Sequence, residues 1–211
     1  VYPRKKELKI IPKVFNGLFL VLLVALGYLF TSNFPVFKLP VPSGKYIVGT
    51  SNFDFTFNRK EVITANKNDQ RKVTVKTWYP AREKSAREDA YIDKGGRNGF
   101  AKKYGLPNST FNYLDKIQTY IYKDAVPHNK KFPVLLFSHG YNSKANNYYS
   151  FLSELASHGY IIFAINHTYE STGSTFSDSS EVYFDYDYFN KIQENTWLTM
   201  EPVIAAFKEK P

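Results

Sequence analysis

The sequence predicts an α/β fold in which an antiparallel pair of strands precedes a β–α–β unit, with one apolar helix in front of both. Three observations carry this prediction. Residues 14–30 form an apolar run without charges, residues 53–79 contain two stretches in which apolar and polar residues alternate, and residues 133–165 hold two short apolar runs on either side of a segment with helical periodicity.

The apolar run at residues 14–30 predicts a transmembrane anchor, because its length is at the lower end of what spans a bilayer core of about 30 Å. The alternative is a cleaved signal peptide, but residues 31–37 contain no small-x-small cleavage pattern. Basic residues crowd residues 1–13, so the positive-inside rule places the N-terminus in the cytoplasm and the folded domain outside the cell membrane. Residues 31–45, with several prolines, form the linker.

The composition and charge of the chain limit the kinds of partner and site that are expected. The chain is 43% hydrophobic and 18% aromatic, enough to bury a core. The net charge of +9 is concentrated at Arg4, Lys5, Lys6, Lys9 and Lys13, which indicates a membrane-flanking segment, so no nucleic-acid partner is expected; salt-sensitive retention on DNA would indicate the opposite. The absence of cysteine excludes disulfides, thiolate metal sites and a cysteine nucleophile. The sequence does not indicate an oligomeric state.

Two strands are predicted where apolar residues alternate with polar ones. Phe53, Phe55 and Phe57 alternate in the first, and residues 73–79 alternate in the second. A polar connection joins them, so we expect the two strands to pair. Pro80 is predicted to end the second strand, since proline cannot donate to a strand ladder.

Residues 82–131 have a weaker pattern and are basic. They are predicted to form either a surface insertion or a lid-like segment that faces the substrate. Helical spacing of Phe111, Leu114, Ile117 and Ile121 predicts that the segment is partly helical.

The β–α–β unit begins with an unbroken apolar run at residues 133–137, typical of a strand covered on both faces. The helix that follows repeats apolar residues from Tyr148 to Ala156, with Asn142 or Ser143 as its predicted N-cap and Gly159 in the left-handed position past its end. A second run at residues 160–165 completes the unit, so its two strands should be parallel.

Beyond this unit, residues 177–190 are predicted to form a surface loop rich in acidic and aromatic residues. An amphipathic helix is predicted from the spacing of apolar residues after it, with Pro202 as a kink or a second start. Its apolar positions are Ile192, Trp197, Met200, Val203, Ile204 and Phe207.

The segment FSHGYNS, residues 137–143, lies where the first parallel strand meets its helix. Ligands of open α/β sheets bind at the carboxyl ends of strands. Gly140 lets the backbone approach a substrate closely, so the N–H of Tyr141 is the candidate donor to a developing oxyanion. Such a donor is typically worth roughly 3 to 4 kcal/mol of barrier in ester hydrolysis.

The stretch PVLLFSHGYNSKANNYYSFLSELASHGYIIFAINHTYES resembles the strand, oxyanion turn, helix and strand of α/β-hydrolases. It is most similar to the platelet-activating-factor acetylhydrolase family. The segments KLPVPSGKYIVGT and KVTVKTWYPA of this chain also resemble the opening strands of that family. The resemblance covers most of residues 38–211 and implies that residues 46–211 are a partial α/β-hydrolase fold. It further implies a serine esterase for short-acyl or phospholipid esters, without metal or cofactor. Tyr141 would supply one oxyanion N–H, and Ser138, His139 and Gly140 would shape the turn without acting as acid or base.

The chain departs from the family in one respect: it contains no G-x-S-x-G, and Gly173-Ser174 lacks the flanking pattern. In the family the acid and the catalytic histidine follow the nucleophile. The chain alone is therefore predicted to be an inactive fragment of an esterase. The alternative is a non-catalytic, membrane-tethered binding protein on a degenerate hydrolase scaffold. A partial sheet would also leave flanks of its parallel strands uncovered, which predicts poor solubility.

The remaining polar candidates are expected to be structural. His158 lies in the last turn of the predicted helix, where a cation interacts favourably with the helix dipole, and His128 lies in a polar loop, where it is expected to be solvated. His167 and Glu170 follow the second parallel strand, at the edge where sites form, but the family takes its base from elsewhere. No spacing of histidines or carboxylates indicates a metal.

Overall fold

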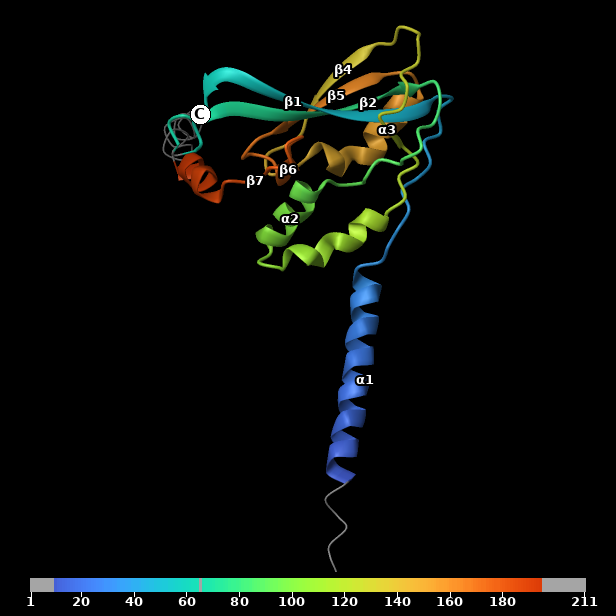
Figure 1. Ribbon diagram of the computed structural model, residues 1–211, viewed down its shortest axis with the longest axis vertical. Helices are drawn as coiled ribbons and strands as arrows, with labels where there is room; N and C mark the ends of the chain where they lie inside the picture. The colour runs from blue at the N-terminus through green and yellow to red at the C-terminus, as the bar shows by residue number, and fades with distance from the viewer. Residues whose placement is uncertain (1–9, 65, 195–211) are drawn as a thin grey trace, which may run out of the picture. The chain divides into compact units, whose positions relative to one another are not determined.

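The computed structural model describes residues 10–64 and 66–194. The chain divides into two compact units, residues 1–37 and residues 38–211 (Figure 1).

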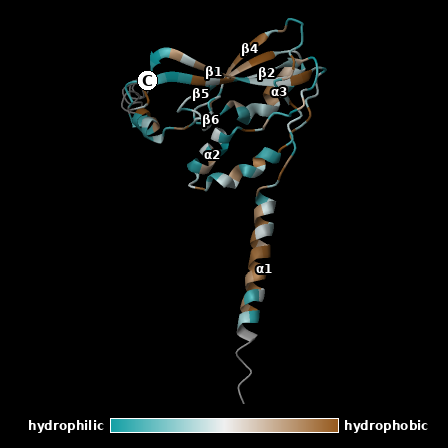
Figure 2. Cartoon of the chain, viewed as in Figure 1, coloured by the Kyte–Doolittle hydropathy of each residue, from teal (hydrophilic) through white to brown (hydrophobic). Residues whose placement is uncertain are grey.

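The first unit contains one helix, α1, which spans Ile10–Asn33. It is apolar along most of its length (Figure 2). The helix extends past the predicted run at both ends, and Thr31 and Asn33 donate to the carbonyls of Gly27 and Leu29, which satisfies part of its last turn. By length and composition, residues Pro12–Asn33 are able to cross a membrane, but a signal sequence passes the same test, so the anchor stays a prediction.

The second unit is built on a five-stranded mixed sheet in the order β3-β1-β2-β5-β4. Strands β1 (Ile47–Lys60) and β2 (Gln70–Ala81) are antiparallel neighbours, with Phe53 opposite Val75, which confirms the predicted pair. The prediction that Pro80 ends the second strand is wrong, because β2 continues to Ala81 and Pro80 pairs with Val48 inside it. It is tolerated because it lies one residue before the end of the strand, where a missing N–H costs little of the ladder.

The β–α–β unit is confirmed. Strands β4 (Val134–Ser138) and β5 (Ile161–His167) run parallel, and helix α3 (Tyr149–Ser157) connects them after the 3-10 turn η3 (Ala145–Tyr148). Gly159 has φ of +100°, as its predicted position requires. The predicted N-caps are wrong: Tyr148 is the N-cap of α3, and the amide of Ala145 in η3 donates to Asn166 Oδ1 at 3.0 Å.

Strand β4 is the last strand in the sheet order, and it is not covered on both faces as its apolar run would suggest; it is uncovered, as predicted for the parallel strands of a partial sheet. Its Val134 is 56% exposed and its Leu136 78% exposed. The register and the alternation along strands place Leu136, Phe53 and Phe55 on one face of the sheet, where they are all exposed. The opposite face carries the main core, which also includes residues of α3 and of the segment before β4. Its buried members are Val48, Trp78, Ile121, Ala145, Tyr149, Leu152, Ala156, Ile162 and Ala164.

Residues 82–131 contain helix α2 (Lys94–Lys103), the kinked 3-10 segment η2 (Asn108–Lys116) and the short strand β3 (Tyr122–Lys123), which runs parallel to β1. The predicted helical spacing holds only through Leu114, because η2 ends at Lys116 and Ile121 lies beyond it in the core. The segment therefore supplies core residues. Its role as an insertion or a lid stays a prediction.

A small hairpin follows β5. Strands β6 (Gly173–Thr175) and β7 (Glu181–Tyr183) are antiparallel, so residues 177–190 are more ordered than the predicted loop. Helix α2 packs closely on β6: a Cβ at Gly95 would lie 2.4 Å from the carbonyl oxygen of Ser174. Residues 186–194 are helical, so the predicted amphipathic helix begins earlier than expected. The rest of that prediction, from Trp197 to Phe207, lies outside the described residues.

Candidate active site

The predicted oxyanion turn, residues 138–143, lies at the carboxyl end of β4. Gly140 and Tyr141 are exposed, and Tyr141 is 45% accessible. The turn borders a pocket of about 240 Å³ that is lined by His139, Gly140, Tyr141, His167 and Glu170. The backbone beside Gly140 therefore reaches an open crevice at the margin of the sheet, the geometry that the assignment requires.

The amide of Tyr141, like that of Gly140 before it, differs from the two amides that follow. The N–H of Asn142 donates to the carbonyl of Glu170 at 2.9 Å, and the N–H of Ser143 donates to the carbonyl of Gly140 at 3.1 Å. Within residues 10–64 and 66–194 the N–H of Tyr141 has no acceptor. A Cβ added at Gly140 would meet no atom within 4 Å, so the space beside this peptide is open to a ligand.

His139 supports the turn through hydrogen bonds between its ring and the backbone. Its ring is buried, with Nδ1 2.8 Å from the carbonyl oxygen of Gly140 and Nε2 accepting the backbone N–H of His167 at 3.4 Å. Burial lowers the pKa of His139, which favours the neutral ring. Both ring nitrogens are engaged with the backbone, as expected of a residue that shapes the turn.

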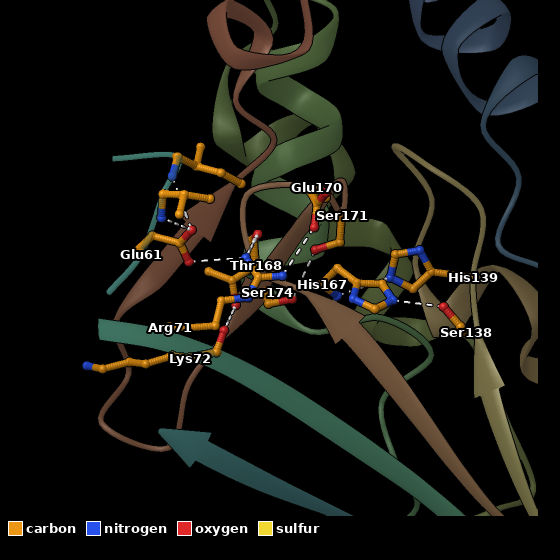
Figure 3. A network of polar contacts seen from close by, with 12 residues as sticks. Glu61, Arg71, Lys72, Ser138, His139, His167, Thr168, Glu170, Ser171 and Ser174 are labelled. Carbon is orange, nitrogen blue, oxygen red and sulfur yellow. Dashed lines mark hydrogen bonds and ion pairs between the residues drawn. The ribbon is translucent and has the colours of Figure 1, made fainter. Parts of the chain in front are cut away.

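The sequence did not indicate that Ser138 and His167 form a pair. Ser138 Oγ lies 2.8 Å from His167 Nε2, and Figure 3 shows the two side chains facing each other. The register between β4 and β5 explains the pair. Ser138, the last residue of β4, pairs with Ile165, so it lies close to His167, the last residue of β5. The distance suits a hydroxyl nucleophile and its base. In the described part of the chain, however, no third side chain hydrogen-bonds to the other nitrogen of His167.

A charged cluster beside the turn was also missed. Arg71 of β2 forms ion pairs with Glu61 and with Glu170, each at 3.1 Å, and donates to the carbonyl of Thr168 at 3.1 Å (Figure 3). Burial of Arg71 would lower its pKa, but the two carboxylates outweigh it and raise the pKa above its usual value. No local pattern indicates this cluster, because its members come from the β1–β2 connection, β2 and the residues after β5.

Residues 167–172, called the β5 loop below, bind the turn directly. In addition to the bond from Asn142 to Glu170, the Thr172 N–H donates to the carbonyl of Ser143 at 3.0 Å. The Thr172 hydroxyl donates to the carbonyl of Asn142 at 3.1 Å. The turn is thus held by the segment that follows the neighbouring strand.

Aromatic rings flank the pocket on the side of Tyr141. The Tyr141 ring lies 5.4 Å from Phe184 in an edge-on contact and 5.4 Å from Phe189 in a stacked one. Such pairs stabilise a contact beyond their area burial. The residue that carries the candidate amide is therefore held through its side chain as well as through the turn.

The other sequence candidates lie away from the turn. His158 is the C-cap residue of α3 and pairs with Glu154 at 3.0 Å, which fits its predicted structural role. The prediction that His128 is solvated is wrong, because its ring is partly buried against the rings of Tyr46 and Phe132. Ser174 is buried in β6. Among residues 10–64 and 66–194, His, Asp and Glu form no group of three that could hold a metal.

A family model for platelet-activating factor acetylhydrolase, isoform II, matches residues 31–208. The chain belongs to this family. It is 25% identical over 169 residues to a platelet-activating factor acetylhydrolase of Canis lupus familiaris, covering 74% of the chain and 35% of that protein. It is 24% identical over 182 residues to the enzyme of the same name from Bos taurus, covering 82% of the chain and 37% of that protein. The chain thus spans little more than a third of these relatives.

A solved structure supports the fold of this platelet-activating factor acetylhydrolase family member. The ferulic acid esterase from Streptomyces cinnamoneus is similar with a TM-score of 0.58 and 19% identity, over 70% of this chain and 41% of that one. At this identity the likeness concerns the fold alone. The resemblance to α/β-hydrolases and to this family, predicted from the sequence, is confirmed.

Proposed function

We propose that this chain is part of a carboxylic ester hydrolase for short-acyl or phospholipid esters, in which the amide of Tyr141 stabilises the oxyanion. The observation that carries the proposal is the exposed N–H of Tyr141, which has no acceptor in the described chain and lies beside the 240 Å³ pocket. Membership of the acetylhydrolase family supports the reaction class.

The chemistry follows from the position of this donor. When a nucleophile attacks an ester, the carbonyl oxygen gains negative charge, and a fixed N–H that points at it lowers the barrier by about 3 to 4 kcal/mol. The turn is fixed in advance, because the amides on the C-terminal side of Tyr141 are already bonded and its ring is packed. Little reorganisation is then needed during the reaction.

The 211 residues alone are proposed to lack turnover. They contain no G-x-S-x-G. Ser138 has a base within hydrogen-bond distance, but it is also part of the turn that would bind the oxyanion, and no described group orients His167 from its other side. The nucleophile, the acid and the base are therefore expected from other residues of the parent enzyme.

The coding sequence after Pro211 provides the first test. A frame that continues into G-x-S-x-G, followed by Asp and His, supports the esterase. A stop codon at that point supports the alternative, a non-catalytic binding protein on a hydrolase scaffold.

The second test addresses the Tyr141 amide in the protein that this frame encodes. Tyr141→Pro removes the N–H, and we expect kcat for a short-chain p-nitrophenyl ester to fall by about 10²-fold or more with little change in KM. Tyr141→Phe keeps the amide and is the matched control. If both variants retain the wild-type kcat, Tyr141 is not the donor.

We also propose that α1 anchors the protein with its N-terminus in the cytoplasm and residues 38–211 outside. The apolar helix and the basic residues before it support this orientation. Because the chain has no cysteine, single cysteines at Lys5 and Lys102 can report the topology with an impermeant maleimide. Intact cells should label Lys102→Cys but not Lys5→Cys. A mature chain that has lost residues 1–30, seen by mass spectrometry, would instead show a signal peptide.

A further inference from the structure

We infer that Arg71 is a positioning residue for the oxyanion turn and acts on it through Glu170. The inference rests on the role proposed for the Tyr141 amide. Arg71 touches neither the turn nor the pocket at the Tyr141 peptide, so its influence has to pass through the β5 loop.

Arg71 holds the β5 loop at two points. One guanidinium nitrogen, Nη1, donates to the carbonyl of Thr168, and the other, Nη2, donates to the carboxylate of Glu170. Nη1 also pairs with Glu61, whose side chain is 1% exposed. A guanidinium is planar and presents its donors in a fixed arrangement, so it sets the distance between the groups that it binds.

The loop needs such support because of its backbone. Tyr169, between the two residues that Arg71 binds, has φ of +66°, a left-handed conformation that is uncommon for a residue other than glycine. A conformation of this kind persists only when its surroundings hold it. Arg71 fixes the residue before Tyr169 and the residue after it.

Glu170 transmits this constraint to the turn. Its side chain binds Arg71, and its backbone carbonyl accepts the N–H of Asn142, the residue next to Tyr141. Asn142 itself has φ of +53°. The peptide between Tyr141 and Asn142 is therefore tied to the same residue that Arg71 holds, and the orientation of the neighbouring Tyr141 N–H depends on that tie.

The charges at this place favour a positioning role over a purely stabilising one. Two carboxylates share one guanidinium, and both Arg71 and Glu61 are largely buried. Buried ion pairs contribute little net stability compared with apolar residues of similar size, because desolvation opposes the attraction between charges. What the cluster provides is a defined geometry, since each bond has a fixed direction.

The test compares Glu170→Ala with Glu170→Gln in the full 211-residue chain in detergent. Both variants keep the backbone carbonyl that binds Asn142, but only glutamine keeps an oxygen that can accept from Arg71. We expect Glu170→Ala to raise the hydrogen-exchange rate of the Asn142 amide at least about tenfold and to shift the Tyr141 amide resonance. Glu170→Gln should restore most of both signals. The amides of Ile162 and Ala164 in β5 should not change in either variant.

A second pair of variants addresses Arg71 itself. Arg71→Met alone would leave the buried Glu61 carboxylate without the cation that it pairs with, so the double variant Glu61→Gln/Arg71→Met is used, with the exposed Arg59→Met as matched control. The double variant should reproduce the effect of Glu170→Ala on Asn142, and the control should not.

Two outcomes would overturn the inference. One is an unchanged Asn142 exchange rate and Tyr141 resonance in Glu170→Ala. The other is a rise of equal size at Asn142, Ile162 and Ala164, which would show general destabilisation. Because exchange does not depend on ester hydrolysis, a wild-type kcat in Tyr141→Pro would remove the oxyanion role while leaving the link between Arg71 and the turn intact.

Discussion

The hydroxyl of Ser138 and Nε2 of His167 lie 2.8 Å apart at the adjoining ends of two parallel strands. The pair matters for the interpretation of any activity, because it is a serine with a base in reach in a chain that lacks the nucleophile motif of its family.

The first prediction concerns this pair. The purified 211-residue chain should hydrolyse p-nitrophenyl acetate no faster than buffer, because nothing described orients His167 as a base and the nucleophile motif is absent. Ser138→Ala is the control for any residual rate. Hydrolysis above buffer that disappears in Ser138→Ala would show that Ser138 is a nucleophile and that the chain is not inactive.

The second prediction concerns acid stability. Glu181 accepts hydrogen bonds from Asn98 and Tyr183 and pairs with Lys94, which joins β7 to α2. Burial alone would raise the pKa of Glu181, but these bonds lower it from 4.5 to about 2. Because the folded pKa is the lower one, the stabilisation is complete above about pH 4.5 and is lost as the pH falls towards 2.

Glu181→Gln should therefore lower the free energy of unfolding at pH 7, and the difference from wild type should shrink between pH 4.5 and 2. Urea unfolding of the chain in detergent at several pH values measures this. The exposed Glu83 is the matched control and should show no such dependence when changed to Gln. A difference that stays constant down to pH 2 would contradict the assigned pKa.

The third prediction concerns residues 82–131. Ile121 is fully buried in the main core, so Ile121→Ala should cost about 2 to 5 kcal/mol in urea unfolding. Tyr104 lies in the same segment and is 62% exposed, so Tyr104→Ala should change the free energy of unfolding by no more than about 0.5 kcal/mol. Equal effects of the two changes would mean that the segment does not share the core.

The fourth prediction concerns the open face of the sheet. Phe53, Phe55 and Leu136 are exposed there, and β4 has a free edge, so residues 38–211 expressed without α1 should self-associate. Changing all three to Ser should increase the monomer fraction in sedimentation experiments. Phe151→Ser is the control, because Phe151 is exposed on α3. A wild-type segment that sediments as a sharp monomer would be evidence against an exposed adhesive face.

The strands could be predicted because their signals are local. Alternation in β1 and β2 and the apolar runs of β4 and β5 reflect which side chains each strand buries, and burial repeats along the strand itself. Gly159 was predictable for the same reason, since a left-handed residue after a helix depends on the next few residues only.

The interactions that were missed join residues far apart in the sequence. The backbone of Ala145 is capped by Asn166, 21 residues later, and not by the polar residues beside it. Arg71 meets Glu170 across 99 residues, and nothing in the composition around either residue indicates a partner. The turn sequence indicated where the candidate site lies, but the side chains that hold the turn could be found only from the register of the sheet.

The bonds from the β5 loop to the oxyanion turn have a consequence for synthesis on the ribosome. Glu170 and Thr172, which form hydrogen bonds with the turn, are synthesised after the residues of the turn. The nascent turn therefore leaves the exit tunnel with only its internal bonds, such as that from Ser143 to Gly140, and it acquires the bonds to the β5 loop only after β5 has emerged. A chain that ends before Glu170 would therefore lack the bonds that Glu170 and Thr172 make to the turn.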